Sequence, residues 1–333
     1  MSTKFSKPAI DVQQQLELLK QRGLKINDEK RALLFLESVS FFRLTPYMRP
    51  FQYLNSQHIF KPGTGFKDLS RLYDFDRRLR LLAMDALERI EVSVRTRVSN
   101  LMCSYGSHWY LEAKHFNAKY DHARLISTIE KIQKDEKDYY TRECAQIDKN
   151  NPKDIAKKEV LKRKRKIENY ARHYELTYDE PKTMPTWAIF EELTFGELSH
   201  FYKGIALDSD KKRIAQSFGL NFPLMESWLH ALTIVRNVCA HHSRFWNREL
   251  GVKPAIPKAK KDMVWATYLN IPNSHMRIAM VLAILHFFMQ RVSPDTSWHK
   301  RLFELFDSFP EIDLEAMGLP LNWRDDVFWQ VVK

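Results

Sequence analysis

The feature that most constrains the fold is a long run of apolar residues, spaced three and four apart, between residues 69 and 101. The run consists of Leu69, Leu72, Leu79, Ala83, Ala86, Leu87, Ile90, Val94, Val98 and Leu101. This spacing puts all of them on one face of an α-helix, so the pattern predicts an amphipathic helix that continues to about Gly106. At about 1.5 Å per residue, such a helix would span roughly 50–60 Å.

The other segments also predict helices rather than strands. Helical patterns cover residues 11–22, 27–40, 181–205, 211–218, 222–241, 273–292 and 297–309. Gly23 separates the first two, and Asp28 is placed to cap the second. We expect Pro46 and Pro50 to prevent a continuous helix through the stretch that contains them, and Gly196 to be a weak point of the helix at 181–205. No segment alternates with a period of two over the length of a strand, so the predicted fold is all-α.

We predict an N-terminal helical region (1–62), a helical-bundle domain (63–310) and a C-terminal tail segment (311–333). Residues 121–175 are highly charged and hold few apolar residues, so we expect a helical insertion with two solvent-facing helices. Its basic run contains Lys157, Lys158, Lys162, Arg163, Lys164, Arg165 and Lys166. Such a run is either a plain solvated helix face or a surface that follows a phosphate backbone, and the sequence leaves both open.

The overall charge favours a polyanionic partner. Lys and Arg number 53 against 41 acidic residues, for a formal net charge of +12. Nucleic acid and a membrane surface are both such partners, and a merely solvated basic surface is the alternative. The longest apolar stretch, 278–289, is shorter than the roughly 20 residues that a bilayer requires, and we interpret it as a core helix. The three cysteines are isolated and the N-terminus lacks an apolar signal core, so we expect a cytoplasmic protein.

The stretch "RNVCAHHSRFWNR" (236–248) is a polar ending to an otherwise apolar helix. Asn237 and His241 are four residues apart and share a helix face, and the long side chain of Arg236 can reach the same end. A guanidinium can hold phosphate oxygens, an imidazole can exchange a proton with a ribose 2′-hydroxyl or a leaving 5′-oxygen, and an amide can orient either. These groups suit phosphodiester chemistry without a metal. The chain contains no HExxH, Walker or GxGxxG motif.

The same residues also have structural interpretations. Arg236 can form a salt bridge, and His241 can be a satisfied core histidine or a cation at a helix carboxyl end. The adjacent pair His241 and His242 suggests a metal site, but neighbouring helical residues point about 100° apart, which makes a shared ion awkward.

Several separate segments resemble the Abi family of bacterial abortive-infection proteins, the AbiD/AbiF-like group of the HEPN superfamily. They are "KPAIDVQQQLELLKQRGLKI", "SFFRLTPYMRPF", "LYDFDRRLRLLAMDALERIEVSVRTRV", "GSHWYL" and "RNVCAHHSRFWNREL". The resemblance runs up to about residue 250. It implies a HEPN-type helical bundle and a metal-independent endoribonuclease, with Arg236, Asn237 and His241 as the catalytic residues.

The resemblance also implies a homodimer in which two motifs share one composite cleft. It implies cleavage that leaves a 2′,3′-cyclic phosphate, and a toxin-like role in phage defence that a protein or RNA antitoxin holds in check. The expected partner is RNA, as substrate and as a structured non-coding regulator, and no metal, cofactor or membrane is expected. The alternatives are a non-catalytic RNA-binding module, and a protein-interaction or membrane-surface effector.

Further residues have supporting interpretations. Glu91 either orients Arg236 or forms an exposed ion pair with Arg95 on its own helix, which we favour. His242 is expected to support the site, and Arg244 and Arg248 to extend phosphate binding.

Arg43, Tyr47 and Arg49 either contact RNA or buttress the bundle. Trp246 either stacks on a base or packs in the core, and core packing is favoured.

Overall fold

The computed structural model describes residues 8–54, 58–258, 264–270 and 274–330. These residues form fourteen α-helices, short 3-10 turns and isolated β-bridges, without a strand. The predicted all-α fold is therefore confirmed. The α-helices are α1 (Val12–Gln21), α2 (Glu29–Val39), α3 (Phe41–Met48), α4 (Phe66–Met102), α5 (His122–Asn150), α6 (Ile155–Ile167), α7 (Tyr170–Glu175), α8 (Thr186–Glu192), α9 (Phe195–Gly204), α10 (Asp208–Gln216), α11 (Phe222–Ala240), α12 (Ile278–Val292), α13 (Trp298–Asp307) and α14 (Val327–Gln330).

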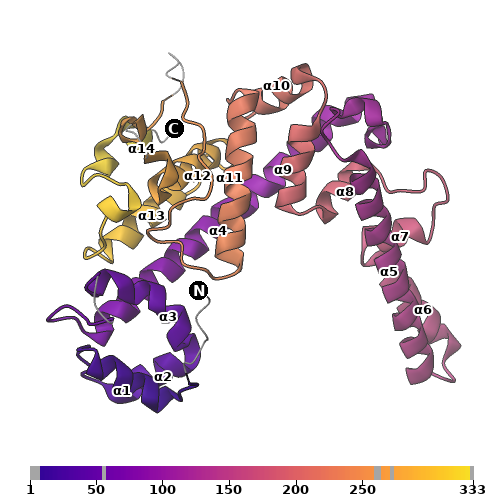
Figure 1. Ribbon diagram of the computed structural model, residues 1–333. Helices are drawn as coiled ribbons and strands as arrows, with labels where there is room; N and C mark the ends of the chain where they lie inside the picture. Colours follow the sequence, from indigo (N-terminus) through magenta and orange to yellow (C-terminus); the bar gives the residue numbers. More distant parts are fainter. Residues whose placement is uncertain (1–7, 55–57, 259–263, 271–273, 331–333) are drawn as a thin grey trace, which may run out of the picture.

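Helix α4 is the central element of the fold. Its 37 residues include the whole predicted apolar stripe, of which every member except the half-buried Leu101 is buried. Helices α3, α8, α10, α11, α12 and α13 pack against it. Figure 1 shows α4 crossing the molecule, with the N-terminal helices at one end and the α5–α7 arm beyond the other.

The N-terminal helices begin where the sequence predicts. Asp28 caps α2 by accepting a hydrogen bond from the backbone N–H of Arg31 at 2.9 Å, which confirms its predicted role. The expectation for Pro46 was wrong, because Pro46 lies inside α3. Proline removes the hydrogen bond to the carbonyl of Phe42, and because Phe42 is 87% exposed, water can satisfy that carbonyl. Pro50 lies in the 3-10 turn Arg49–Phe51 that ends this stretch.

The segment 181–205 contains two helices rather than one helix with a weak point at Gly196. The break falls at Leu193 and Thr194, between α8 and α9. Thr194 starts α9 with a capping box, in which its hydroxyl accepts from the backbone N–H of Glu197 while the Glu197 carboxylate accepts from the N–H of Thr194. Gly196 then lies within the first turn of α9.

The charged segment 121–175 forms an arm that extends away from the body of the molecule (Figure 1). Helices α5 and α6 lie side by side, joined by ion pairs such as Lys162–Asp148 at 2.9 Å, and α6 has no buried residue. The short α7 is a third helix that the sequence did not predict. It packs against α5 and pairs Arg172 with Glu136 at 2.7 Å.

Two hydrophobic cores hold the chain together. A small one lies among α1, α2, α3 and the start of α4, and a large one surrounds the rest of α4. The described residues of 311–333 add Trp323, Phe328 and Trp329 to the large core.

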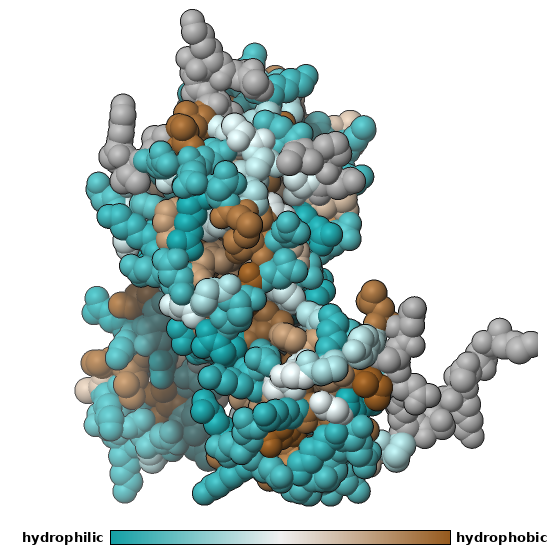
Figure 2. Space-filling view, turned by 90° about the vertical axis from the view of Figure 1, so that its left-hand side faces the viewer, coloured by the Kyte–Doolittle hydropathy of each residue, from teal (hydrophilic) through white to brown (hydrophobic). Residues whose placement is uncertain are grey.

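Helix α12 is buried along most of its length, which confirms that 278–289 is a core helix. Among the described helices, none has the length and apolar character that a membrane span requires. Figure 2 shows that polar side chains cover most of one face, with apolar ones scattered among them.

Candidate active site at the end of α11

The predicted motif occupies the last turns of α11. This helix is apolar where it packs against α4, α9 and α12, and its polar residues begin near the point where it ends. Arg236 is half-buried, whereas Asn237 and His241 are exposed. His241 is the C-cap residue, and its backbone N–H donates to the carbonyl of Asn237 at 3.0 Å.

The side chains of Arg236 and His241 are not engaged by other described residues. Within the described part of the chain, neither side chain takes part in a hydrogen bond or an ion pair. His241 is therefore not a satisfied core histidine, and Arg236 is not committed to a salt bridge. The position of His241 at the helix carboxyl end also suits a cation, so the dipole interpretation stays open beside the catalytic one.

The helix ends in a Schellman motif that has histidine where glycine is usual. The N–H of His242 bonds to the carbonyl of Cys239 at 3.0 Å, and the N–H of Ser243 bonds to the carbonyl of Val238 at 2.9 Å. His242 has a φ of 54°, in the left-handed region, and its side chain is exposed. A non-glycine residue costs about 1–2 kcal/mol in this conformation, so the contacts that follow must hold the turn in place.

A buried carboxylate holds the loop that follows the motif. Asp76 of α4 is fully buried and accepts hydrogen bonds from the backbone N–H groups of Phe245 (3.1 Å) and Trp246 (2.5 Å). It also accepts from the hydroxyl of Tyr47 at 2.5 Å and pairs with Arg80. Three distant segments, from α3, α4 and the loop after α11, therefore meet at one carboxyl group.

The electrostatics of this network follow from its burial. Burial raises the pKa of the Asp76 carboxyl above its usual range, while Arg80, the Tyr47 hydroxyl and the two N–H groups oppose that rise. Burial, together with the charge of Asp76, also raises the pKa of the Tyr47 phenol, so the phenol stays a hydrogen-bond donor. Burial likewise raises the pKa of the Cys239 thiol to about 12, which keeps Cys239 a neutral core side chain.

Arg43 contacts the motif directly. Its Nη1 donates to the carbonyl of His242 at 2.6 Å, from the first turn of α3, although the residue remains exposed. This is a buttressing contact of the kind that the sequence left open for Arg43 and Tyr47. The structure therefore fixes the turn after His241 from two sides, by Arg43 at His242 and by Asp76 at Phe245 and Trp246.

The remaining predicted residues are Trp246, Arg244, Arg248 and Glu91. Trp246 is 3% exposed, which confirms that it packs in the core. Arg244 and Arg248 are half-buried next to the motif, and the guanidinium of Arg248 donates to the carbonyl of Arg244 at 3.3 Å. Glu91 pairs with Arg95, as favoured, but both side chains are largely buried rather than exposed.

Arg95 also donates to the carbonyl of Leu193 at 2.7 Å, so this ion pair joins α4 to the carboxyl end of α8, and neither of its side chains bonds to Arg236.

The basic run on α6 is not brought to the motif. The motif loop is held at Asp76, whereas the arm follows the far end of α4, roughly 40 Å along the helix. Four of its cations make contacts within the arm, namely Lys158, Lys162, Arg165 and Lys166. The other three are exposed and form no ion pair with a described residue; they are Lys157, Arg163 and Lys164.

Asp76 and Arg80, which position the motif loop, were not predicted from the sequence. Their signal was present as an acid and a base four residues apart, flanked by the buried Phe75 and Leu79. Among the residues that the structure describes, no group of three or more histidine, cysteine, aspartate or glutamate side chains is arranged to hold a metal ion.

Comparison with known proteins identifies the family. A family model described as Abi-like protein matches residues 34–247, which is more than half of the chain and includes α4, the arm and the α11 motif. No curated protein and no solved structure gives a significant match. The family suggests a role in abortive infection, a form of defence against phage. The chain belongs to the Abi-like protein family.

Proposed function

We propose that this protein is a metal-independent endoribonuclease of abortive infection, with its active site at the end of α11. The observation that supports this most is the exposure of Asn237 and His241 beside Arg236, on a helix end whose following loop is held by Arg43 and Asp76. Polar groups without protein partners, on a supported backbone, are what a site needs to receive a phosphodiester.

In the proposed reaction a ribose 2′-hydroxyl attacks the adjacent phosphorus, and the bond to the 5′-oxygen breaks. His241 exchanges a proton with one of these oxygens, Arg236 stabilises the added negative charge on the phosphoryl group, and Asn237 orients either group. The products are a 2′,3′-cyclic phosphate and a 5′-hydroxyl. Arg244 and Arg248 lie next in the chain and extend the phosphate-binding surface.

We further propose that two copies of the chain build one cleft. Acid–base cleavage uses a proton acceptor and a proton donor, and the twin His241 of a second copy supplies the other group. Phe42 supports this arrangement: it is 87% exposed, and its neighbour Arg43 contacts the motif turn. A large exposed aromatic beside the site is suited to burial by a partner subunit.

An exposed nuclease site in the cytoplasm requires restraint until infection. We propose an antitoxin, either a protein or a structured non-coding RNA, that covers the α11 end. The exposed cations Lys157, Arg163 and Lys164 of the arm are suited to contacting such an RNA through its phosphates.

The test is cleavage of end-labelled RNA by purified protein in EDTA, after co-purifying RNA has been removed. Wild-type protein should cleave, and His241→Ala should lower the rate by about 100-fold or more while RNA binding remains. His230→Ala is the matched control, because His230 is an exposed histidine earlier on the same helix and should cleave like wild type. The 3′ ends should resist ligation until the cyclic phosphate is removed.

Three outcomes would contradict the proposal. Cleavage that EDTA abolishes would indicate a metal enzyme, and equal cleavage by His241→Ala would place the chemistry elsewhere. RNA binding without cleavage under every condition would support the non-catalytic RNA-binding module instead.

A further inference from the structure

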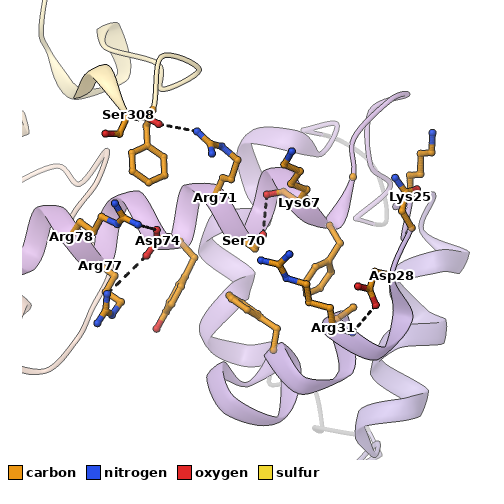
Figure 3. Close-up of a pocket in the computed structure, with 17 residues that line it drawn as sticks. Lys25, Asp28, Arg31, Lys67, Ser70, Arg71, Asp74, Arg77, Arg78 and Ser308 are labelled. Atoms are coloured by element: carbon orange, nitrogen blue, oxygen red, sulfur yellow. Dashed lines mark hydrogen bonds and ion pairs between the residues drawn. The ribbon is translucent and has the colours of Figure 1, made fainter. Parts of the chain in front are cut away.

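A cavity lies away from the α11 motif. It has a volume of about 750 Å³ and lies between α2, the first turns of α4 and the segment that follows α13 (Figure 3). This volume is in the range of small-molecule sites, roughly 300–1,000 Å³. None of the residues proposed for RNA cleavage lines it.

The cavity wall is strongly cationic. Six lysine and arginine side chains line it against two carboxylates, Asp28 and Asp74. Both carboxylates are already engaged: Asp28 caps α2, and Asp74 pairs with Arg78 at 2.9 Å and lies 3.9 Å from Arg77. The wall therefore carries positive charge that its own acids do not balance.

Three of these cations have no partner of their own. Lys25, Arg31 and Lys67 come from three different segments, are exposed, and form no ion pair with any residue that the structure describes. Arg71 differs, because it is bound to Glu311 and donates to the carbonyl of Ser308 at 2.9 Å, which ties the end of α13 to α4. Free cations from separate segments that line one cavity are suited to a ligand with several negative oxygens.

Four aromatic side chains also line the wall, namely Phe35, Phe66, Tyr73 and Phe309. Phe35 packs edge-on against Phe66 and Tyr73, with ring centroids 5.7 Å apart in each case. On the other side, the guanidinium groups of Arg71 and Arg78 lie over the ring of Phe309 at 4.9 and 5.3 Å. Aromatic rings and guanidinium planes are the surfaces on which nucleobases stack.

We propose that this cavity binds a nucleotide unit. Its phosphate groups lie against Lys25, Arg31 and Lys67, and its base lies against the aromatic wall. The unit is either a free nucleoside polyphosphate or one residue of an RNA strand, since both present the same chemistry. The proposal stands apart from the nuclease activity, because the two sites share no residue.

The test is calorimetric titration in EDTA with ATP, a short oligoadenylate and adenosine. The protein carries His241→Ala, so that the oligoadenylate is not cleaved. ATP or the oligoadenylate should bind, and adenosine should bind at least about tenfold more weakly because it lacks phosphate. Adding Arg31→Ala and Lys67→Ala should weaken binding by about tenfold or more for each cation removed.

Lys30→Ala is the matched control, because Lys30 is an exposed cation next to Arg31 that does not line the cavity. Its affinity should equal that of the parent, and circular dichroism should show that every variant is folded. Binding of ATP alone would identify a free nucleotide, and binding of the oligoadenylate alone would identify a strand. The proposal is overturned if neither binds, if the double substitution leaves affinity unchanged, or if adenosine binds as tightly as ATP.

Discussion

Asp76→Asn is the sharpest test of how the motif loop is held. The substitution keeps the shape of the side chain but removes the charge that faces Arg80, which is itself only 5% exposed. It also turns one oxygen into an N–H₂ donor, which faces the N–H of Trp246 at the Oδ1 position or the hydroxyl of Tyr47 at the Oδ2 position. Breaking a buried ion pair on one side costs about 3–5 kcal/mol, because the remaining charge stays buried without a partner.

The assay is urea unfolding followed by circular dichroism. With a slope of about 3 kcal/mol per molar urea, the expected loss lowers the midpoint by about 1 M or more. Cleavage of RNA should also fall, because the N–H groups of Phe245 and Trp246 lose the charge of their acceptor and one of the support contacts of the turn after His241 becomes weaker.

The control is Asp74→Asn, two residues earlier on the same helix. Asp74 pairs with Arg77 and Arg78, whose side chains are more than half exposed, and such surface pairs contribute about 0–1 kcal/mol. If Asp76→Asn and Asp74→Asn unfold at the same urea concentration, burial of Asp76 does not hold the loop and the reasoning fails.

Two further predictions concern histidines. His242→Gly should leave the free energy of unfolding unchanged or raise it by up to about 1 kcal/mol, since glycine adopts the left-handed conformation without strain. A loss larger than about 1 kcal/mol in urea unfolding would show that the imidazole itself stabilises the turn. Burial lowers the pKa of His286 to about 3, so the unfolded chain binds its proton first and this contribution to stability falls as the pH drops from about 6.5 towards 3. Between about pH 7 and pH 5 it should amount to about 2 kcal/mol, measured as the difference between wild type and His286→Phe; equal pH dependence of the two proteins would disprove it.

Most of the helices could be predicted from the sequence, because the interactions that start a helix and bury one of its faces act between residues that are close in the sequence. The apolar stripe fixes α4 since each of its residues needs the same buried face, and the cap at Asp28 acts within three residues. The error at Gly196 has an equally local cause. The capping box between Thr194 and Glu197 was readable in the sequence, and two reciprocal hydrogen bonds define a helix start better than one glycine weakens a helix.

The candidate site was predictable only in part. The motif residues are adjacent in sequence, so helical geometry was enough to place them at one end of α11. The supports were not predictable in this way, since Asp76 lies 169 residues from Phe245 and Arg43 lies 199 from His242. A charged residue inside a helical pattern usually faces solvent, and only the packing of α3, α4 and the loop makes Asp76 the exception.

The backbone of residues 242–246 is held by hydrogen bonds, whereas the side chains of Arg236 and His241 are not, and this difference follows from the place where α11 ends. A helix that continued past His241 would carry the following residues away from α4, and Asp76 would lose two of its donors. The turn at His242 instead sends the chain back to the core, where Phe245 and Trp246 are buried, at the cost of a left-handed histidine. Strained residues persist where surrounding contacts over-determine them, and these contacts belong to the backbone of 242–246. The side chain of His241 therefore takes no part in holding the turn, which leaves its imidazole available for chemistry.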